Sequence, residues 1–178
     1  MGYTVAQLGS DFRAALKAHP GPAGREKVCE ILKKALVDKD FVKANFDDNT
    51  PERKILYEDP ELGFCILAHH YRGAKESTPH DHGRAWVVYG VQSGALEIGT
   101  YVRVEDSRGQ KLVRRETVVL RPGEASAYLP GDIHDTRCLT ENALVFRFTE
   151  RDLRHEDQVE RRVTRFVEQG GEWFAAVR

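Results

Sequence analysis

The sequence has few cysteines and no long hydrophobic run. Its three cysteines, at positions 29, 65 and 138, form no CxxC pair, and so sparse and odd a set is typical of reduced thiols and argues against a cysteine-bound zinc cluster. No apolar run approaches the roughly 18 residues that a membrane-spanning helix needs. The first 20 residues also lack the charged-then-apolar profile of a signal peptide. We therefore expect a cytoplasmic protein with no membrane partner.

The chain also lacks an excess of charge of either sign. It carries 27 basic and 28 acidic residues, a net charge of −1. Because phosphate binding requires a basic excess, this composition argues against nucleic acid as the main partner. Of the 178 residues, 40% are hydrophobic and 31% are charged, which is typical of a globular domain with its own core. We predict a single domain over residues 1–178.

Three regions of different pattern follow one another along the chain. Residues 1–45 carry apolar residues at spacings of three and four on both sides of "PGPAG" (20–24), which predicts two amphipathic helices, the second beginning at Pro22. Residues 54–149 contain short β-rich runs separated by Gly and Pro, which indicates an antiparallel sandwich or barrel. We expect residues 150–178 to form an extension that either covers the barrel or contacts another subunit.

Two histidines stand two residues apart in "STPHDHGRAW" (77–86). In an extended segment, residues i and i+2 point to the same side, so His80 and His82 are either two ligands of one metal or surface histidines in a turn. A third histidine, His134, follows a Pro-Gly turn in "LPGDIHDTRC" (129–138). In a rolled β fold its strand can lie beside the first pair. We predict that these three histidines bind a metal ion.

The two histidine segments resemble the two motifs of the cupin superfamily. "TPHDHGRAWVVYGVQSG" (78–94) is similar to the first motif, and "LPGDIH" (129–134) is similar to the second. The resemblance covers residues 54–149. It implies a mainly β fold, the double-stranded β-helix or jelly-roll barrel, with N-terminal α-helices and a C-terminal extension added. Cupins usually place a glutamate ligand where Trp86 and Val87 stand here, so three neutral histidines remain.

Among cupins, a three-histidine site is similar to that of the cysteine dioxygenase, or thiol dioxygenase, group. The stretch "GFCILAHHYRG" (63–73) also resembles that group. The resemblance implies a mononuclear non-haem Fe(II) dioxygenase that oxidises a small molecule, such as a thiol carboxylate, with O2. It also implies that Arg53 binds the substrate carboxylate. The group's Ser-x-His-x-Tyr triplet is absent from "VFRFTERD" (145–152), so the chain resembles a divergent member.

The residues themselves leave other functions open. Imidazole ligands suit Fe, Zn, Cu and Ni alike. A Zn, Ni or Mn cupin acting as an isomerase, hydrolase or lyase is one alternative, and a non-catalytic barrel that binds a small molecule is another. The helices or the tail are candidate contacts of a homodimer.

Further residues are candidates for substrate binding and catalysis. Arg84 has the same parity as the histidine pair, and Arg147 alternates with two phenylalanines, so each of these arginines faces either the barrel interior or solvent. Arginine matches the two oxygens of a carboxylate. Tyr89 and Tyr128 either donate a proton near bound oxygen or pack in the wall. His69 is adjacent to His70 in a predicted strand, so only one of that pair can point inward.

Overall fold

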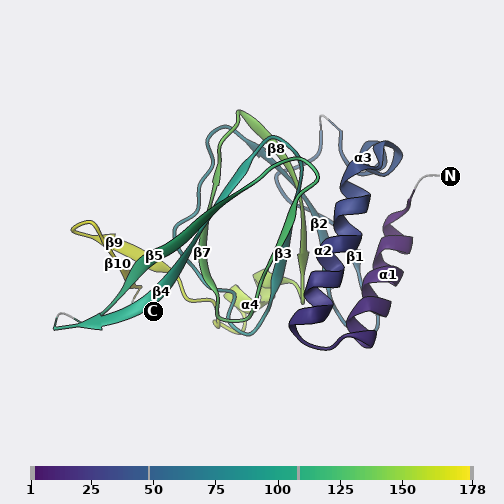
Figure 1. The fold of residues 1–178 in the computed structure, drawn as a ribbon. Coiled ribbons are helices and arrows are strands. Elements are labelled where there is room, and N and C mark those ends of the chain that lie inside the picture. Colours follow the sequence, from purple (N-terminus) through teal and green to yellow (C-terminus); the bar gives the residue numbers. More distant parts are fainter. Residues whose placement is uncertain (1–2, 48, 108, 177–178) are drawn as a thin grey trace.

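The protein is mainly β, with helices at its N-terminal end (Figure 1). The computed structural model describes residues 3–47, 49–107 and 109–176. The helices are α1 (Val5–Ala18), α2 (Pro22–Val37), α3 (Lys39–Asn45) and α4 (Leu153–Gln158). The strands are β1 (Lys54–Glu58), β2 (Cys65–Arg72), β3 (Val87–Ser93), β4 (Leu96–Asp106), β5 (Gly109–Leu120), β6 (Ala125–Tyr128), β7 (Ile133–Cys138), β8 (Asn142–Thr149), β9 (Phe166–Gln169) and β10 (Glu172–Ala175).

Two five-stranded antiparallel sheets form the barrel. One has the order β1-β2-β8-β3-β6 and the other β7-β4-β5-β10-β9. Strands β1 to β8 all lie within residues 54–149, and Figure 1 shows the two sheets facing each other across the barrel interior. The predicted fold class, a mainly β double-stranded β-helix (jelly-roll) barrel with N-terminal helices and a C-terminal extension, is therefore confirmed.

Helices α1 and α2 cover the outer side of the first sheet (Figure 1). Thr4 and Gln7 form a capping box at the start of α1. Pro22 opens α2, as the sequence predicts. The buried Leu32 of α2 packs in the same cluster as Phe148 of β8. The short α3 was not predicted as a separate helix; it begins where the Asp38 carboxylate accepts hydrogen bonds from the backbone.

Alternation along β8 separates the two layers of the core. Phe146 and Phe148 belong to the cluster under the helices, whereas Ala143 and Val145 belong to the cluster inside the barrel. Because successive residues of a strand point to opposite faces, Arg147 points to the interior. This orientation puts a guanidinium inside the barrel.

The C-terminal segment is part of the barrel wall. Strand β10 pairs with β5 as well as with β9, and α4 lies at the lower end of the barrel in Figure 1. The backbone N–H of Phe166 donates to the carbonyl of Pro79 at 3.0 Å. Of the two roles left open by the sequence, these contacts support the covering role.

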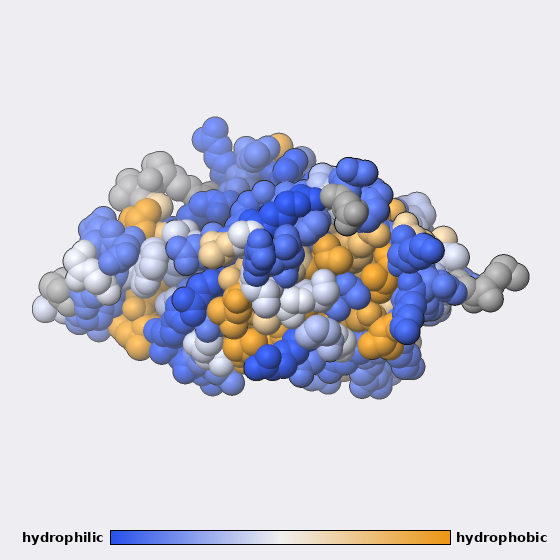
Figure 2. Space-filling model, turned by 90° about the horizontal axis from the view of Figure 1, so that it is seen from above, coloured by the Kyte–Doolittle hydropathy of each residue, from blue (hydrophilic) through white to orange (hydrophobic). Residues whose placement is uncertain are grey.

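No helix in the described part of the chain is long and apolar enough to cross a membrane. Figure 2 shows a largely hydrophilic face on which apolar residues form separate patches. The most exposed large apolar side chains, Val37 and Val159, belong to different parts of the fold.

Candidate metal centre

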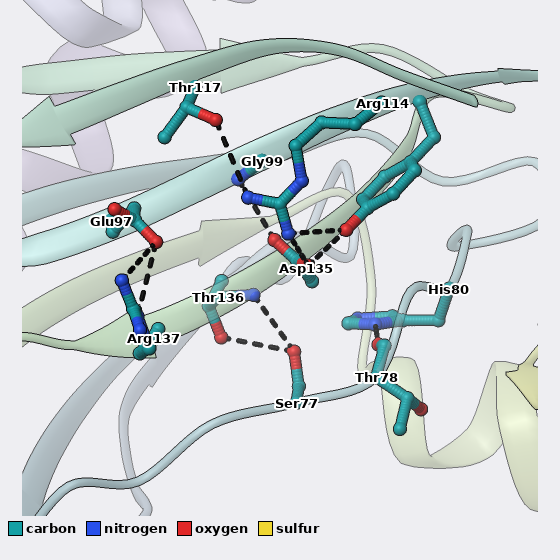
Figure 3. Close-up of polar contacts among 11 residues, drawn as sticks. Ser77, Thr78, His80, Glu97, Gly99, Arg114, Thr117, Asp135, Thr136 and Arg137 are labelled. Atoms are coloured by element: carbon teal, nitrogen blue, oxygen red, sulfur yellow. Dashed lines mark hydrogen bonds and ion pairs between the residues drawn. The ribbon is translucent and has the colours of Figure 1, made fainter. Parts of the chain in front are cut away.

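An isolated antiparallel bridge brings His80 to His134. The backbone N–H of each donates to the carbonyl of the other, both at 3.0 Å. Upstream of this bridge, Ser77 bonds to Thr136 of β7 through backbone and side chain, and Figure 3 shows this segment lying along the strand. The loop that carries the first two histidines is therefore fixed against the strand that carries the third.

The three predicted histidines form one group. His80, His82 and His134 each offer a ring nitrogen, and these atoms all lie within 4.8 Å of one another. His134 is fully buried and His82 nearly so. The group contains no carboxylate, so its donor set is three imidazoles, which suits Fe, Zn, Cu or Ni. The site therefore fits a metal ion, as the sequence predicts, without selecting which one.

The histidines are held in the protonation state that a metal requires. Burial is the largest cause that lowers the pKa of all three imidazoles below the usual value, and the Arg147 charge adds to this effect. Each ring is therefore neutral at neutral pH and can coordinate. Nδ1 of His80 lies 2.9 Å from the carbonyl of Thr78 (Figure 3). With Nδ1 as the donor in that bond, Nε2 is left for a metal.

Two of the predicted substrate and catalytic residues touch these histidines. Arg147 donates from Nη2 to Nε2 of His82 at 3.2 Å, and the Tyr89 hydroxyl lies 3.2 Å from Nε2 of His134. Both groups therefore lie directly beside the nitrogens that would hold a metal. Burial raises the pKa of Tyr89, so its hydroxyl stays protonated and is available as a hydrogen-bond donor.

A cavity of about 270 Å³ opens next to the histidines. His80, His82, Tyr89, Arg53 and Arg147 all line it. Its volume lies just below the range of about 300–1,000 Å³ that is usual for drug-sized ligands. A small molecule in this cavity would contact both the histidines and the arginines.

The other predicted site residues lie in different places. Arg53 lines the cavity but is also paired with Asp152 at 2.7 Å. Tyr128 packs its ring against that of His134, with the centroids 4.8 Å apart, and does not line the cavity. The structure does not bring Arg84 to the cavity either: Gly83 has a positive φ of 62°, so the segment turns and the exposed Arg84 no longer shares a side with the histidines.

Asp81 holds the histidine loop to the C-terminal segment. Its Oδ1 accepts hydrogen bonds from the backbone N–H groups of Gly83 at 3.0 Å and Thr164 at 2.7 Å. The carboxylate is therefore used to fix the loop and is not a fourth ligand of the group. Trp86, at the position of the usual cupin glutamate, packs in the core under the helices with the Arg25 guanidinium 5.2 Å from its ring centroid.

The sequence did not single out the cavity residues that come from the C-terminal segment. Arg154, Asp157 and Arg165 all line the cavity. Their charge was visible in the sequence, but the path of the tail was not. Residues 150–178 are charged and fit either a helical or a strand pattern, so the sequence does not predict which surface of the barrel they cover.

His69 is a buried histidine outside the group. It shares the inner face of β2 with Leu67 and Tyr71, both of which line the cavity. Its Nε2 is buried without a hydrogen-bond partner. Burial, reinforced by the charges of Arg147 and Arg53, lowers the pKa of His69 to about 3. The native protein therefore keeps this imidazole neutral.

The pKa of His69 predicts a loss of stability in mild acid. Below about pH 6.5 the His69 imidazole binds a proton in the unfolded chain, whereas in the native state it stays neutral until the pH approaches 3. The stabilisation is thus fully present above pH 6.5 and is lost as the pH falls towards 3. From this residue alone we expect the free energy of unfolding to drop by about 2 kcal/mol at pH 5.

Urea unfolding at pH 7.5 and pH 5, with a chelator present, measures this loss. The variant His69→Gln should show a shallower dependence on pH than the unchanged protein. His19→Gln, which replaces an exposed histidine, is the matched control and should keep the original slope. Equal slopes in all three proteins would contradict the prediction.

Comparisons with known proteins give structural similarity only. No protein-family model and no curated protein matches the chain. Among solved structures it is similar to KdgF from Halomonas sp., at 23% identity over 58% of this chain and 82% of that one, with a TM-score of 0.44. It is also similar to a cupin-2 domain containing protein from Shewanella frigidimarina, at 15% identity over 66% and 96% of the two chains, with a TM-score of 0.44.

A third similar structure is an uncharacterised conserved protein with a double-stranded β-helix domain from Klebsiella pneumoniae. It is 16% identical over 61% of this chain and 79% of that one, with a TM-score of 0.43. At these low sequence identities, the similarity is one of fold alone. The resemblance to the cysteine dioxygenase group stays a prediction.

Proposed function

We propose that this cupin-type barrel is a mononuclear non-haem Fe(II) dioxygenase that oxidises a small molecule, such as a thiol carboxylate, with O2. The observation that carries the proposal is the contact of Arg147 and Tyr89 with a cluster of three neutral histidines beside a cavity. A metal-binding group, an anion-binding group and a hydroxyl donor meet there. This set of groups suits the oxidation of an anionic substrate.

The histidines would hold the iron. Iron bound by three neutral imidazoles keeps its full +2 charge, which favours a negatively charged substrate group, and it supplies the O2 chemistry. His80 is oriented by the Thr78 carbonyl, and its loop is fixed by Asp81. These supporting bonds set the position of the ligand atoms before any metal arrives.

Arg147 would bind and orient the substrate. Its guanidinium lies with Cζ 5.4 Å from the centroid of the Tyr89 ring, and its buried Nε has no partner. A guanidinium carries five N–H donors in one plane and matches a carboxylate with two parallel hydrogen bonds. Arg147 therefore favours a substrate with a carboxylate beside its reacting group.

Tyr89 would donate a hydrogen bond or a proton at the metal-facing end of the cavity. Its hydroxyl is buried and stays protonated because burial raises its pKa. Tyr128 has no such position; burial raises its pKa to about 12, and its ring supports His134. We assign the proton-donor role to Tyr89 and a packing role to Tyr128.

Metal content and oxygen uptake test the proposal. Protein purified from unsupplemented medium should contain about one iron per chain, and adding the right thiol carboxylate should start O2 consumption. Zinc, nickel or manganese in place of iron would favour an isomerase, hydrolase or lyase instead. Iron-loaded protein that consumes no O2 with a broad panel of thiols and small carboxylates would overturn the dioxygenase proposal.

A further inference from the structure

Four arginines line the cavity beside the histidines, and they differ in their partners. Arg53 is paired with Asp152, and Arg165 is paired with Asp157. Within the described ranges, no carboxylate lies at ion-pairing distance from Arg147 or Arg154. Two of the four positive charges are therefore neutralised by the protein, and two are not.

Arg147 stands at the inner end of the cavity. It comes from the middle of β8, contacts His82 at 3.2 Å and lies over the ring of Tyr89. Its Nε is buried and unpartnered. Desolvating a guanidinium without a carboxylate is costly, so this charge is poised for a negative group from a ligand.

Arg154 comes from a different wall. It is the second residue of α4, the helix at the barrel opening, and it is exposed. Its backbone N–H donates to Asp152 Oδ1 at 3.0 Å, the same carboxylate oxygen that pairs with Arg53. This shared carboxylate ties the start of α4 to the cavity wall and fixes the place from which the Arg154 side chain extends.

We propose that the cavity binds a small dicarboxylate, with one carboxylate on Arg147 beside the histidines and the other on Arg154 at the opening. The inference rests on the proposed function only in taking this cavity as the substrate site. A monocarboxylate would leave one guanidinium without a counter-charge, whereas a dicarboxylate neutralises both. The volume of about 270 Å³ limits the ligand to a short carbon chain.

Binding of matched acids to the full chain tests the inference. Succinate and butyrate have the same number of carbons and differ by one carboxylate. By titration calorimetry at pH 7.5, we expect succinate to bind about threefold to fivefold more tightly, because an ion pair at an exposed arginine is worth a few-fold in affinity. The succinate affinity should also fall more steeply with added salt.

Substitutions separate the two arginines. Arg154→Gln should weaken succinate about threefold to fivefold and leave butyrate unchanged, whereas Arg147→Gln should weaken both acids. Arg84→Gln is the matched control, because Arg84 is exposed and does not line the cavity; it should change neither. Since Arg154 is also exposed, its loss is not expected to disturb folding.

Two outcomes overturn the inference: equal affinities for succinate and butyrate, or an Arg154→Gln variant that behaves like Arg84→Gln. Repeating the titration on zinc-loaded protein keeps the result separate from the dioxygenase proposal. There the preference for the dicarboxylate should persist although no O2 chemistry takes place. Failure of O2 uptake with iron would then leave the binding result intact.

Discussion

Replacing His134 with alanine should abolish stoichiometric metal binding. His134 is fully buried and supplies one of the three clustered nitrogens. Loss of a group that merely orients a metal ligand lowers affinity about 10–100-fold, so loss of a ligand itself should cost at least about 100-fold. Metal-dependent activity should disappear with the metal. The measurement is the metal-to-protein ratio after reconstitution and dialysis.

Controls for this experiment must separate metal loss from misfolding. Alanine at a buried position leaves a void, so His134→Gln, which is closer in size, should be measured beside it, with circular dichroism as a check on the fold. His155→Ala removes an exposed histidine of α4 and should keep full metal content. A His80→Ala or His134→Ala protein that binds metal and turns over normally would contradict every metal-centred account of this site.

Replacing Phe148 with alanine should lower the free energy of unfolding by about 3–5 kcal/mol. The side chain is fully buried between β8 and the helices. Its ring centroid lies 4.4 Å from that of Phe12, 4.7 Å from that of Phe64 and 4.9 Å from that of Trp86. The substitution therefore removes the centre of an aromatic cluster that holds α1 to the barrel.

Urea unfolding at constant pH measures this cost. Phe174→Ala is the matched control, because Phe174 lies half-exposed on β10 and should cost clearly less. Metal affinity should change little in Phe148→Ala, since that side chain points away from the histidines. A loss below about 1 kcal/mol would show that the helix layer does not depend on this cluster.

The spacing of apolar residues predicted the fold well, because the helix layer repeats every three to four residues and the strands alternate every two. The helical spacing in residues 1–45 and the alternation of Phe146 and Phe148 in β8 both follow directly from which side is buried. The same alternation left only two orientations for Arg147, and packing of the phenylalanines against the helices selected the inward one. The histidine group was predictable because residues i and i+2 of an extended segment point to the same side, and because the strand of His134 can lie beside that pair in a rolled β fold.

The alternation of side chains along an extended segment did not predict the position of Arg84, because the backbone stops being extended before that residue. The positive φ of Gly83 turns the chain between His82 and Arg84, and a Cβ at Gly83 would lie 2.8 Å from Cβ of Arg162. That close approach depends on a residue far along the chain, so no local pattern reveals it. The same is true of Arg154: its place in the cavity depends on how the tail crosses the barrel opening.

The bond between Asp81 and Thr164 also has a consequence for how the protein is made. The two residues are 83 positions apart in the chain, and the Asp81 N–H donates in turn to the Thr164 carbonyl at 3.0 Å. During translation, the loop bearing the first two histidines emerges long before the segment that anchors it. In the nascent chain this loop therefore lacks its Thr164 anchor until the segment after α4 has been synthesised, and before then the bridge to His134 is available to hold it.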